Sequence, residues 1–364
     1  MYSVHQSRGW RGFRILAHNK NRMKKLLLAL LLGAVFTAAH AQRKEPSVEV
    51  LSKGTRTSLR GLSVVDDNVA WVSGSGGTIG RSTDGGATWK WTVVKGFEKR
   101  DFRDIEAFSP TKAIIIAVDS PAYILKTIDG GETWKQVYAN HTPGMFLDAM
   151  EFWNEQAGIV VGDPIGGRLF ILRTFDEGET WQEVPFDHRP AVDSGEAMFA
   201  SSGTNVRVLD RDEAVLITGG RRSRALVRHE AIVLPLVQGL ESTGANSIAV
   251  QDFRTRKGGK HMIVVGGDFT KAAQDSLNCF YSNNRGRSWV APDVPPHGYR
   301  SCVEYLSKKS AVACGLNGVD ISYDGGRSWT WISKEGFQVC RKAKKGTALF
   351  FAGGNGKVGK LKVH

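Results

Sequence analysis

Short apolar runs alternate with turn-forming residues along most of this chain. The stretch from residue 102 to 138 shows the pattern clearly. Val, Ile, Phe and Tyr fill its runs, while Gly, Pro and Asp mark the reversals between them. Four strands joined by tight turns predict an antiparallel meander. The predicted strands are Phe102–Phe108, Ala113–Val118, Tyr123–Thr127 and Thr133–Tyr138.

One short motif occurs five times along the chain. Its copies are RSTDGGATW, KTIDGGETW, RTFDEGETW, YSNNRGRSW and ISYDGGRSW, which end at Trp89, Trp134, Trp181, Trp289 and Trp329. The tryptophans are 45, 47, 108 and 40 residues apart, so the long interval fits two units of 54, one without the motif. A period of this size indicates repeated copies of one small sheet. Units beginning near residues 59, 101, 146, 196, 245, 299 and 336 give seven copies.

Seven four-stranded antiparallel sheets predict an all-β, seven-bladed β-propeller, formed as a single domain by residues 42–364. The last unit, from residue 336 to 363, shows only three strands. We expect Ser47–Leu51 to supply the fourth and to close the ring by joining the two ends of the chain. Closure leaves no sheet edge exposed.

The aspartates of the motif have two interpretations. In the structural one, Asp84, Asp129, Asp176 and Asp324 accept hydrogen bonds from turn amides, the glycines supply positive φ, and each tryptophan packs between neighbouring sheets. In the other, the aspartates bind calcium or take part in catalysis. We favour the structural interpretation, because Asp-Gly turns close hairpins without any ligand.

The first 41 residues resemble a leader with a signal peptide. Lys24 and Lys25 give a basic start after Met23, an apolar stretch follows, and Ala39-His40-Ala41 forms a small-residue cleavage site before Gln42. Met23 is the predicted true start. We therefore expect a periplasmic or secreted protein without a membrane span in the mature chain, since the apolar stretch is too short to cross a bilayer comfortably.

The formal charge of +13 comes largely from the leader. The leader holds seven of the 49 basic residues and none of the 36 acidic ones, so the remainder has 42 basic and 36 acidic residues and a charge of +6. That is an ordinary surface charge, and it removes the main support for nucleic-acid binding.

The four cysteines all lie in the last quarter of the chain and form no CxxC pair. We therefore predict no metal site, and no cofactor is expected. Cys302 and Cys314 flank a predicted hairpin turn at Ser307–Ser310, so a disulfide between them and a pair of buried free thiols both stay open.

The motif S/T-x-D-x-G-x-T-W resembles the Asp-box, or BNR repeat, of sialidases, xyloglucan-degrading enzymes, sortilin-type receptors and the photosystem II stability/assembly factor family. The resemblance to the assembly-factor family extends from Arg56 to Val363 and includes stretches outside the motif. These are Val161–Pro164, Glu196–Asn205, Gly219–Arg221, Val265–Phe269 and Gly298–Ser301. The resemblance implies an exported propeller, and the repeat alone implies no activity.

The face opposite the motif turns collects the candidate site residues. Those predicted to bind a partner are Arg103, Arg189, Arg221, Tyr299 and Arg300. Asp163, Glu196 and Asp268 are candidate catalytic carboxylates, because glycoside hydrolysis needs two carboxylates roughly 5 to 9 Å apart. A role as turn residues bonded to their own backbone is the open alternative for Asp163 and Asp268.

Two functions follow from these residues. The first is a monomeric, non-catalytic scaffold that binds a protein or peptide partner through its arginine-bearing face. The second is a glycoside hydrolase or a glycan-binding module at the same face. Because the Gly-rich stretches at residues 219 and 352 lie between strands, no phosphate loop that opens a helix is expected.

Overall fold

The computed structural model describes residues 45–53, 55–209, 212–227, 230–251 and 259–363. The predicted leader and its cleavage site before Gln42 lie outside these residues. Among the described residues, no helix is both long and apolar enough to cross a membrane. The regular helices described are two short 3₁₀ turns, η1 (Phe186–His188) and η2 (Gly354–Gly356).

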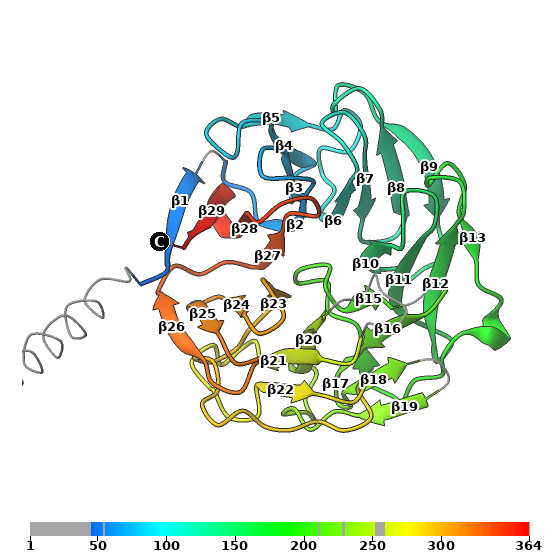
Figure 1. The fold of residues 1–364 in the computed structure, drawn as a ribbon. Helices are drawn as coiled ribbons and strands as arrows, with labels where there is room; N and C mark the ends of the chain where they lie inside the picture. The colour runs from blue at the N-terminus through cyan, green and yellow to red at the C-terminus, as the bar shows by residue number, and fades with distance from the viewer. Residues whose placement is uncertain (1–44, 54, 210–211, 228–229, 252–258, 364) are drawn as a thin grey trace, which may run out of the picture. The chain divides into compact units, whose positions relative to one another are not determined.

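Seven antiparallel sheets, the blades, surround one axis and confirm the predicted seven-bladed propeller (Figure 1). Blade 1 consists of β2 (Leu59–Val64), β3 (Ala70–Gly74), β4 (Thr78–Ser82) and β5 (Lys90–Val93). Blade 2 consists of β6 (Phe102–Ala107), β7 (Ala113–Ala117), β8 (Ala122–Thr127) and β9 (Lys135–Asn140). Blade 3 consists of β10 (Leu147–Phe152), β11 (Gly158–Ile165), β12 (Arg168–Thr174) and β13 (Gln182–Glu183).

The second half of the ring repeats this order. Blade 4 consists of β15 (Val206–Val208), β16 (Ala214–Ile217), β18 (Arg224–Val227) and β19 (Glu230–Val233). Blade 5 consists of β20 (Thr243–Val250), β21 (Met262–Asp268) and β22 (Cys279–Ser282), extended by β14 (Glu196–Ala197) and β17 (Gly219–Gly220). Blade 6 consists of β23 (Cys302–Tyr305), β24 (Ala311–Gly315), β25 (Gly318–Ser322) and β26 (Thr330–Ser333).

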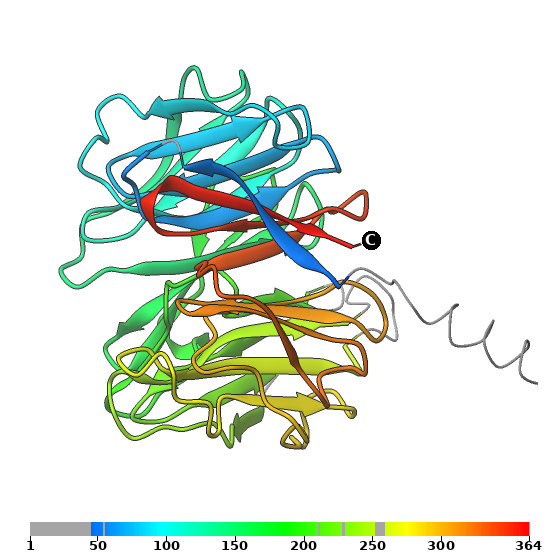
Figure 2. The ribbon, with the colours of Figure 1, turned by 90° about the vertical axis from the view of Figure 1, so that its left-hand side faces the viewer.

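Blade 7 closes the ring with both ends of the chain. Its strands are β27 (Val339–Lys342), β28 (Leu349–Ala352), β29 (Lys357–Lys362) and β1 (Ser47–Lys53). Strand β1 pairs antiparallel with β29, from Ser47 opposite Lys362 to Lys53 opposite Lys357 (Figure 2). The predicted closing strand is confirmed.

Two predicted positions differ from the structure, and each difference has a local cause. The fourth strand of blade 2 begins at Lys135 instead of Thr133, because the Thr133 amide and hydroxyl are bonded to Asp129 within the turn. The unit predicted to begin near residue 196 has its inner strand only from Val206, because the residues between them leave the sheet and enter the centre of the ring.

Apolar side chains are buried between adjacent blades. Each of five apolar clusters joins two neighbouring blades, and a sixth joins blades 6, 7 and 1. The motif tryptophans belong to these interfaces: Trp134 packs on the cluster between blades 1 and 2, and Trp181 lies in the cluster between blades 2 and 3. Because both faces of a blade are covered by its neighbours, its middle strands are almost continuously apolar.

The motif turns are held by their own side chains. In the second copy, Thr127 Oγ1 donates to Asp129 Oδ1 (2.8 Å), and Asp129 accepts from the Thr133 amide (3.0 Å) and hydroxyl (2.5 Å). The bond from the Thr133 hydroxyl is the main reason that the pKa of Asp129 lies below its usual range. In the fourth copy, Asn284 takes the aspartate position and accepts from the Ser288 amide at 3.0 Å.

Candidate functional site

The turns of the propeller define two faces. The turns between the first and second strands of a blade lie beside its motif turn, as the bonds from the Gly130 amide to Thr111 O and from the Gly325 amide to Lys309 O show. We call this side the motif face. The other connections lie on the opposite side, the loop face. The sequence analysis expects the functional site on the loop face.

A cavity of about 590 Å³ opens on the motif face at the axis of the ring, and we call it the axial basin. All seven blades contribute to its lining, which includes the final residues of inner strands and the turns that follow them. Its charged side chains are Glu106, Glu151, Arg207, Glu304, Lys308, Arg341, Lys342 and Lys344. Five basic side chains against three acidic ones leave an excess of positive charge.

One strand position supplies the central side chains of the basin. The penultimate residue of each inner strand is, in blade order, Ser63, Glu106, Glu151, Arg207, Ala249, Glu304 and Arg341. Because side chains alternate in direction along a strand, residues at the same position of each inner strand point in the same direction relative to the axis. Five of the seven residues are charged. Four of these lie between two apolar or aromatic residues, and Arg341 is followed by Lys342.

Ion pairs connect these charges across the axis. Arg207 donates to Glu151 (2.9 Å) and to Glu304 (3.2 Å), and its side chain is only 6% exposed. The guanidinium of Arg341 lies 3.9 Å from both of these glutamates. Strands of blades 3, 4, 6 and 7 are therefore tied together through two arginines and two glutamates.

Burial shifts the protonation of this network. Desolvation raises the pKa of Glu304 to about 7, although Arg207 and Arg341 oppose the shift. Desolvation also raises the pKa of Glu106, whose carboxylate accepts from Lys344 at 2.5 Å. Burial would lower the pKa of Arg341, but the carboxylates around it, Glu151 first, raise it instead.

The segment between β14 and β15 passes through the centre of the ring beside the inner strands (Figure 1). The Gly203 carbonyl accepts from Arg341 at 2.9 Å, and the Ser202 hydroxyl donates to Ser301 O at 2.8 Å. Thr204 donates to Ser247 at 2.6 Å. We call residues 198–205 the plug, because these bonds reach the inner strands of blades 5 and 7 and the start of blade 6.

Asp104 lies beneath the plug on blade 2. It accepts from the Met150 amide at 2.8 Å and from the Ile105 amide at 2.8 Å, and the residue is 1% exposed. Burial raises the pKa of Asp104 to about 8, while the charge of Arg341 opposes the shift.

The residues predicted to bind a partner differ in their accessibility on the loop face. Arg221 keeps 62% of its side chain exposed and Arg103 keeps 27%, with the latter paired to Asp101. Arg189 is 8% exposed and donates to Val184 O. Tyr299 is 3% exposed and donates to Asn246 at 2.8 Å. Arg300 is fully buried, so only Arg103 and Arg221 present much surface to a partner.

The three candidate carboxylates each have their own protein partner. Glu196 is 3% exposed and accepts from Arg224 at 2.8 and 2.6 Å. Asp268 accepts from the Thr270 amide and hydroxyl, as a turn residue does. Asp163 accepts from the Met198 amide at 3.0 Å, and burial raises its pKa. Among the described residues, no hydrogen bond or ion pair joins any two of the three.

One part of the predicted site does come together. Arg103 and Asp163 both act on Asp148, which is fully buried in β10. Burial and then the charge of Asp163 raise the pKa of Asp148, whereas Arg103 lowers it. Asp148 and the ring of charges in the basin were not predicted from the sequence. Charged residues at the same position of successive inner strands could have indicated the ring.

Comparisons with known proteins establish the fold. No family model matches the chain, and no curated protein matches it. It is similar to YCF48 bound to D1 peptide, with a TM-score of 0.61 and 17% identity over 88% of this chain and 96% of that one. It is also similar to YCF48 from Cyanidioschyzon merolae, with a TM-score of 0.62 and 16% identity over 86% of this chain and 98% of that one. The WD40 β-propeller domain of Doa1 is similar with a TM-score of 0.59 and 13% identity over 88% of this chain and 97% of that one.

Proposed function

We propose that this chain is an exported, non-catalytic propeller that binds a protein or peptide partner in the axial basin. The observation that carries the proposal is the basin itself, a cavity of about 590 Å³ lined by all seven blades. A cavity of this size accommodates a few side chains of a partner segment, and its convergent polar groups would fix their orientation.

The charge of the basin favours an acidic segment. Its positive excess comes from Lys308, Lys342 and Lys344 at the turns of blades 6 and 7, and Lys308 is exposed. The arginines are already paired with glutamates and Lys344 with Glu106, so Lys308 and Lys342 are the groups that would attract a carboxylate. Such attraction speeds association and weakens as salt is added.

The similarity of fold also supports the binding of a peptide. One similar propeller, YCF48, has been solved bound to a D1 peptide. A propeller of this architecture therefore binds a peptide, and we extend that capacity to this chain as part of the proposal. An assembly role for this chain belongs to the same proposal, as does its export through the predicted signal peptide.

The arginine-bearing loop face is the alternative location for the partner. Arg221 and Arg103 supply its accessible positive charge. The glycan hypothesis also concerns that face, and it requires Asp163, Glu196 or Asp268 to exchange its present partner for a substrate. Inertness of the purified chain toward a broad glycan panel would count against it.

Selection from a displayed library of random peptides tests the proposal. We expect the selected peptides to be enriched in Asp and Glu, to lose at least tenfold in affinity for the Lys308→Glu variant, and to bind the Arg221→Glu variant unchanged. Loss with Arg221→Glu alone would move the partner to the loop face. If no selected peptide loses affinity for either variant, the result would contradict peptide binding at both faces.

A further inference from the structure

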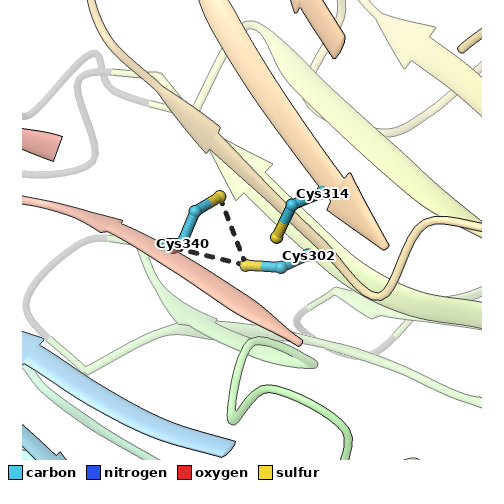
Figure 3. A group of neighbouring side chains, drawn as sticks. All are labelled: Cys302, Cys314 and Cys340. Atoms are coloured by element: carbon cyan, nitrogen blue, oxygen red, sulfur yellow. Dashed lines mark hydrogen bonds between the residues drawn. The ribbon is translucent and has the colours of Figure 1, made fainter. Parts of the chain in front are cut away.

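Three cysteines that are distant in sequence meet between blades 6 and 7 (Figure 3). Cys302 lies in β23, Cys314 in β24 and Cys340 in β27, and each is 0% exposed. Their sulfur atoms all lie within 4.8 Å of one another, and Cys302 Sγ and Cys340 Sγ are 3.7 Å apart. The absence of a CxxC pair led the sequence analysis to expect no metal site, but the fold brings the thiols together without one.

We infer that Cys302, Cys314 and Cys340 form a binding site for one soft, thiophilic metal ion. Sulfurs that share an ion at about 2.3 Å in a plane lie about 4 Å from one another. The observed separations are close to that value, with 3.7 Å between Cys302 and Cys340 and at most 4.8 Å for the other two pairs. Each thiol releases its proton to solvent as its sulfur–metal bond forms.

The surroundings select the class of ion. The cluster is embedded in the apolar core shared by blades 6, 7 and 1, and in the described part of the chain no carboxylate or imidazole joins the three thiols as a candidate ligand. The oxygens nearest to Cys302 Sγ are the Cys340 carbonyl at 3.3 Å and the Thr204 hydroxyl at 3.7 Å. Structural zinc prefers four ligands, whereas monovalent copper is the first-row ion that thiolates favour. The site therefore suits copper(I) better than zinc.

A neighbouring charge compensates part of the negative charge of the thiolates. Arg341 follows Cys340 in β27, and its positive charge acts on Cys302. Because the sulfurs are inaccessible in the closed ring, the ion must enter before blade 7 docks on blade 6. This site does not depend on the partner proposed for the axial basin, although Arg341 lies beside both.

Refolding in the presence of copper(I) tests the site. The full chain is unfolded in guanidinium with a reductant, refolded anaerobically with copper(I), freed of unbound metal by gel filtration and analysed for copper. We expect about one copper per chain for the wild type and for the control Cys279→Ala, whose cysteine is buried in a different cluster. Cys314→Ala and Cys340→Ala should lose at least nine-tenths of this copper.

Three results would overturn the inference. They are a wild type without copper, equal copper in all variants, and a refolded wild type that is lighter by two hydrogens because a disulfide formed. If the alanine variants do not refold, X-ray absorption at the copper edge of the loaded wild type decides instead. Three sulfur neighbours are expected there, and nitrogen or oxygen neighbours would contradict the site.

Discussion

Arg300 and Asp320 form an ion pair in blade 6 in which both side chains are fully buried. Arg300 Nε donates to Asp320 Oδ2 at 2.7 Å, and the same carboxylate contacts His297 Nδ1 at 2.9 Å. Arg300 also donates to Asn317 at 2.5 Å. The arginine that the sequence places on a binding face, two residues before β23, thus pairs with β25 and with the turn that precedes it.

Removing one member of this pair should destabilise the propeller. Arg300→Met leaves the Asp320 carboxylate buried without its main partner, and such losses cost about 3 to 5 kcal/mol. Guanidinium unfolding of the purified chain measures the change. The double variant Arg300→Met with Asp320→Leu should recover part of the loss, because no unpaired carboxylate remains. A change below about 1 kcal/mol in the single variant would show that the pair contributes little.

The plug should not tolerate a side chain at Gly203. This residue has φ of 62°, and an added Cβ would lie 2.3 Å from the Asp104 carboxyl group. Gly203→Ala therefore combines backbone strain with a steric clash, and we expect a loss of about 3 kcal/mol. Gly144→Ala is the matched control, because Gly144 has φ of 80° and nothing within 4 Å of its Cβ position. Equal losses in the two variants would mean that the plug can move away from Asp104.

Stability should fall as the pH rises toward 8. Asp104 has a pKa of about 8 in the folded chain and an ordinary aspartate pKa when unfolded, so the folded state holds its proton more tightly. Its contribution is full below the unfolded pKa and is lost as the pH rises through the folded pKa, at up to about 1.4 kcal/mol per pH unit. Arg341 and Glu106 are the charged groups that act on it.

Guanidinium unfolding at pH 5, 6, 7 and 8 measures this dependence. The variant Asp104→Asn cannot titrate and should show a flatter profile over the same range. Glu304, with a pKa of about 7, should leave a residual slope of the same sign. If Asp104→Asn shows the same pH dependence of stability as the wild type, groups other than Asp104 cause it.

The motif turns should depend on the bonds of their aspartates. Asp129→Ala removes the acceptor of the Glu132 and Thr133 amides and of the Thr133 hydroxyl, so we expect faster amide hydrogen exchange at Glu132 and Thr133 and a lower unfolding midpoint. Asp129→Asn should have the smaller effect, since Asn284 already fills this position in the fourth copy. Because the pKa of Asp129 is lowered by these bonds, its contribution is present at neutral pH and is lost only in strong acid.

The sequence predicts the ring better than it predicts the site. Strand alternation and the repeated turn are local patterns, so the seven blades and the closing strand β1 follow from them directly. The basin depends on residues such as Arg207 and Glu304, which lie 97 positions apart and meet only because the blades surround an axis. Likewise, no local pattern indicates that Cys340 lies beside Cys302, or that Arg300 points inward to Asp320 instead of toward solvent.

Site-specific photo-cross-linking in host cells tests the central claim most directly. A photoreactive amino acid replaces Ser307, which is exposed in the basin, Arg221 on the loop face, or Lys135, whose exposed side chain lies on blade 2 away from the axis. We expect a discrete protein adduct from position 307, its loss when Lys342→Glu is added, and none from position 135. An adduct from position 221 alone, or no adduct from position 307, would contradict binding of a partner in the axial basin.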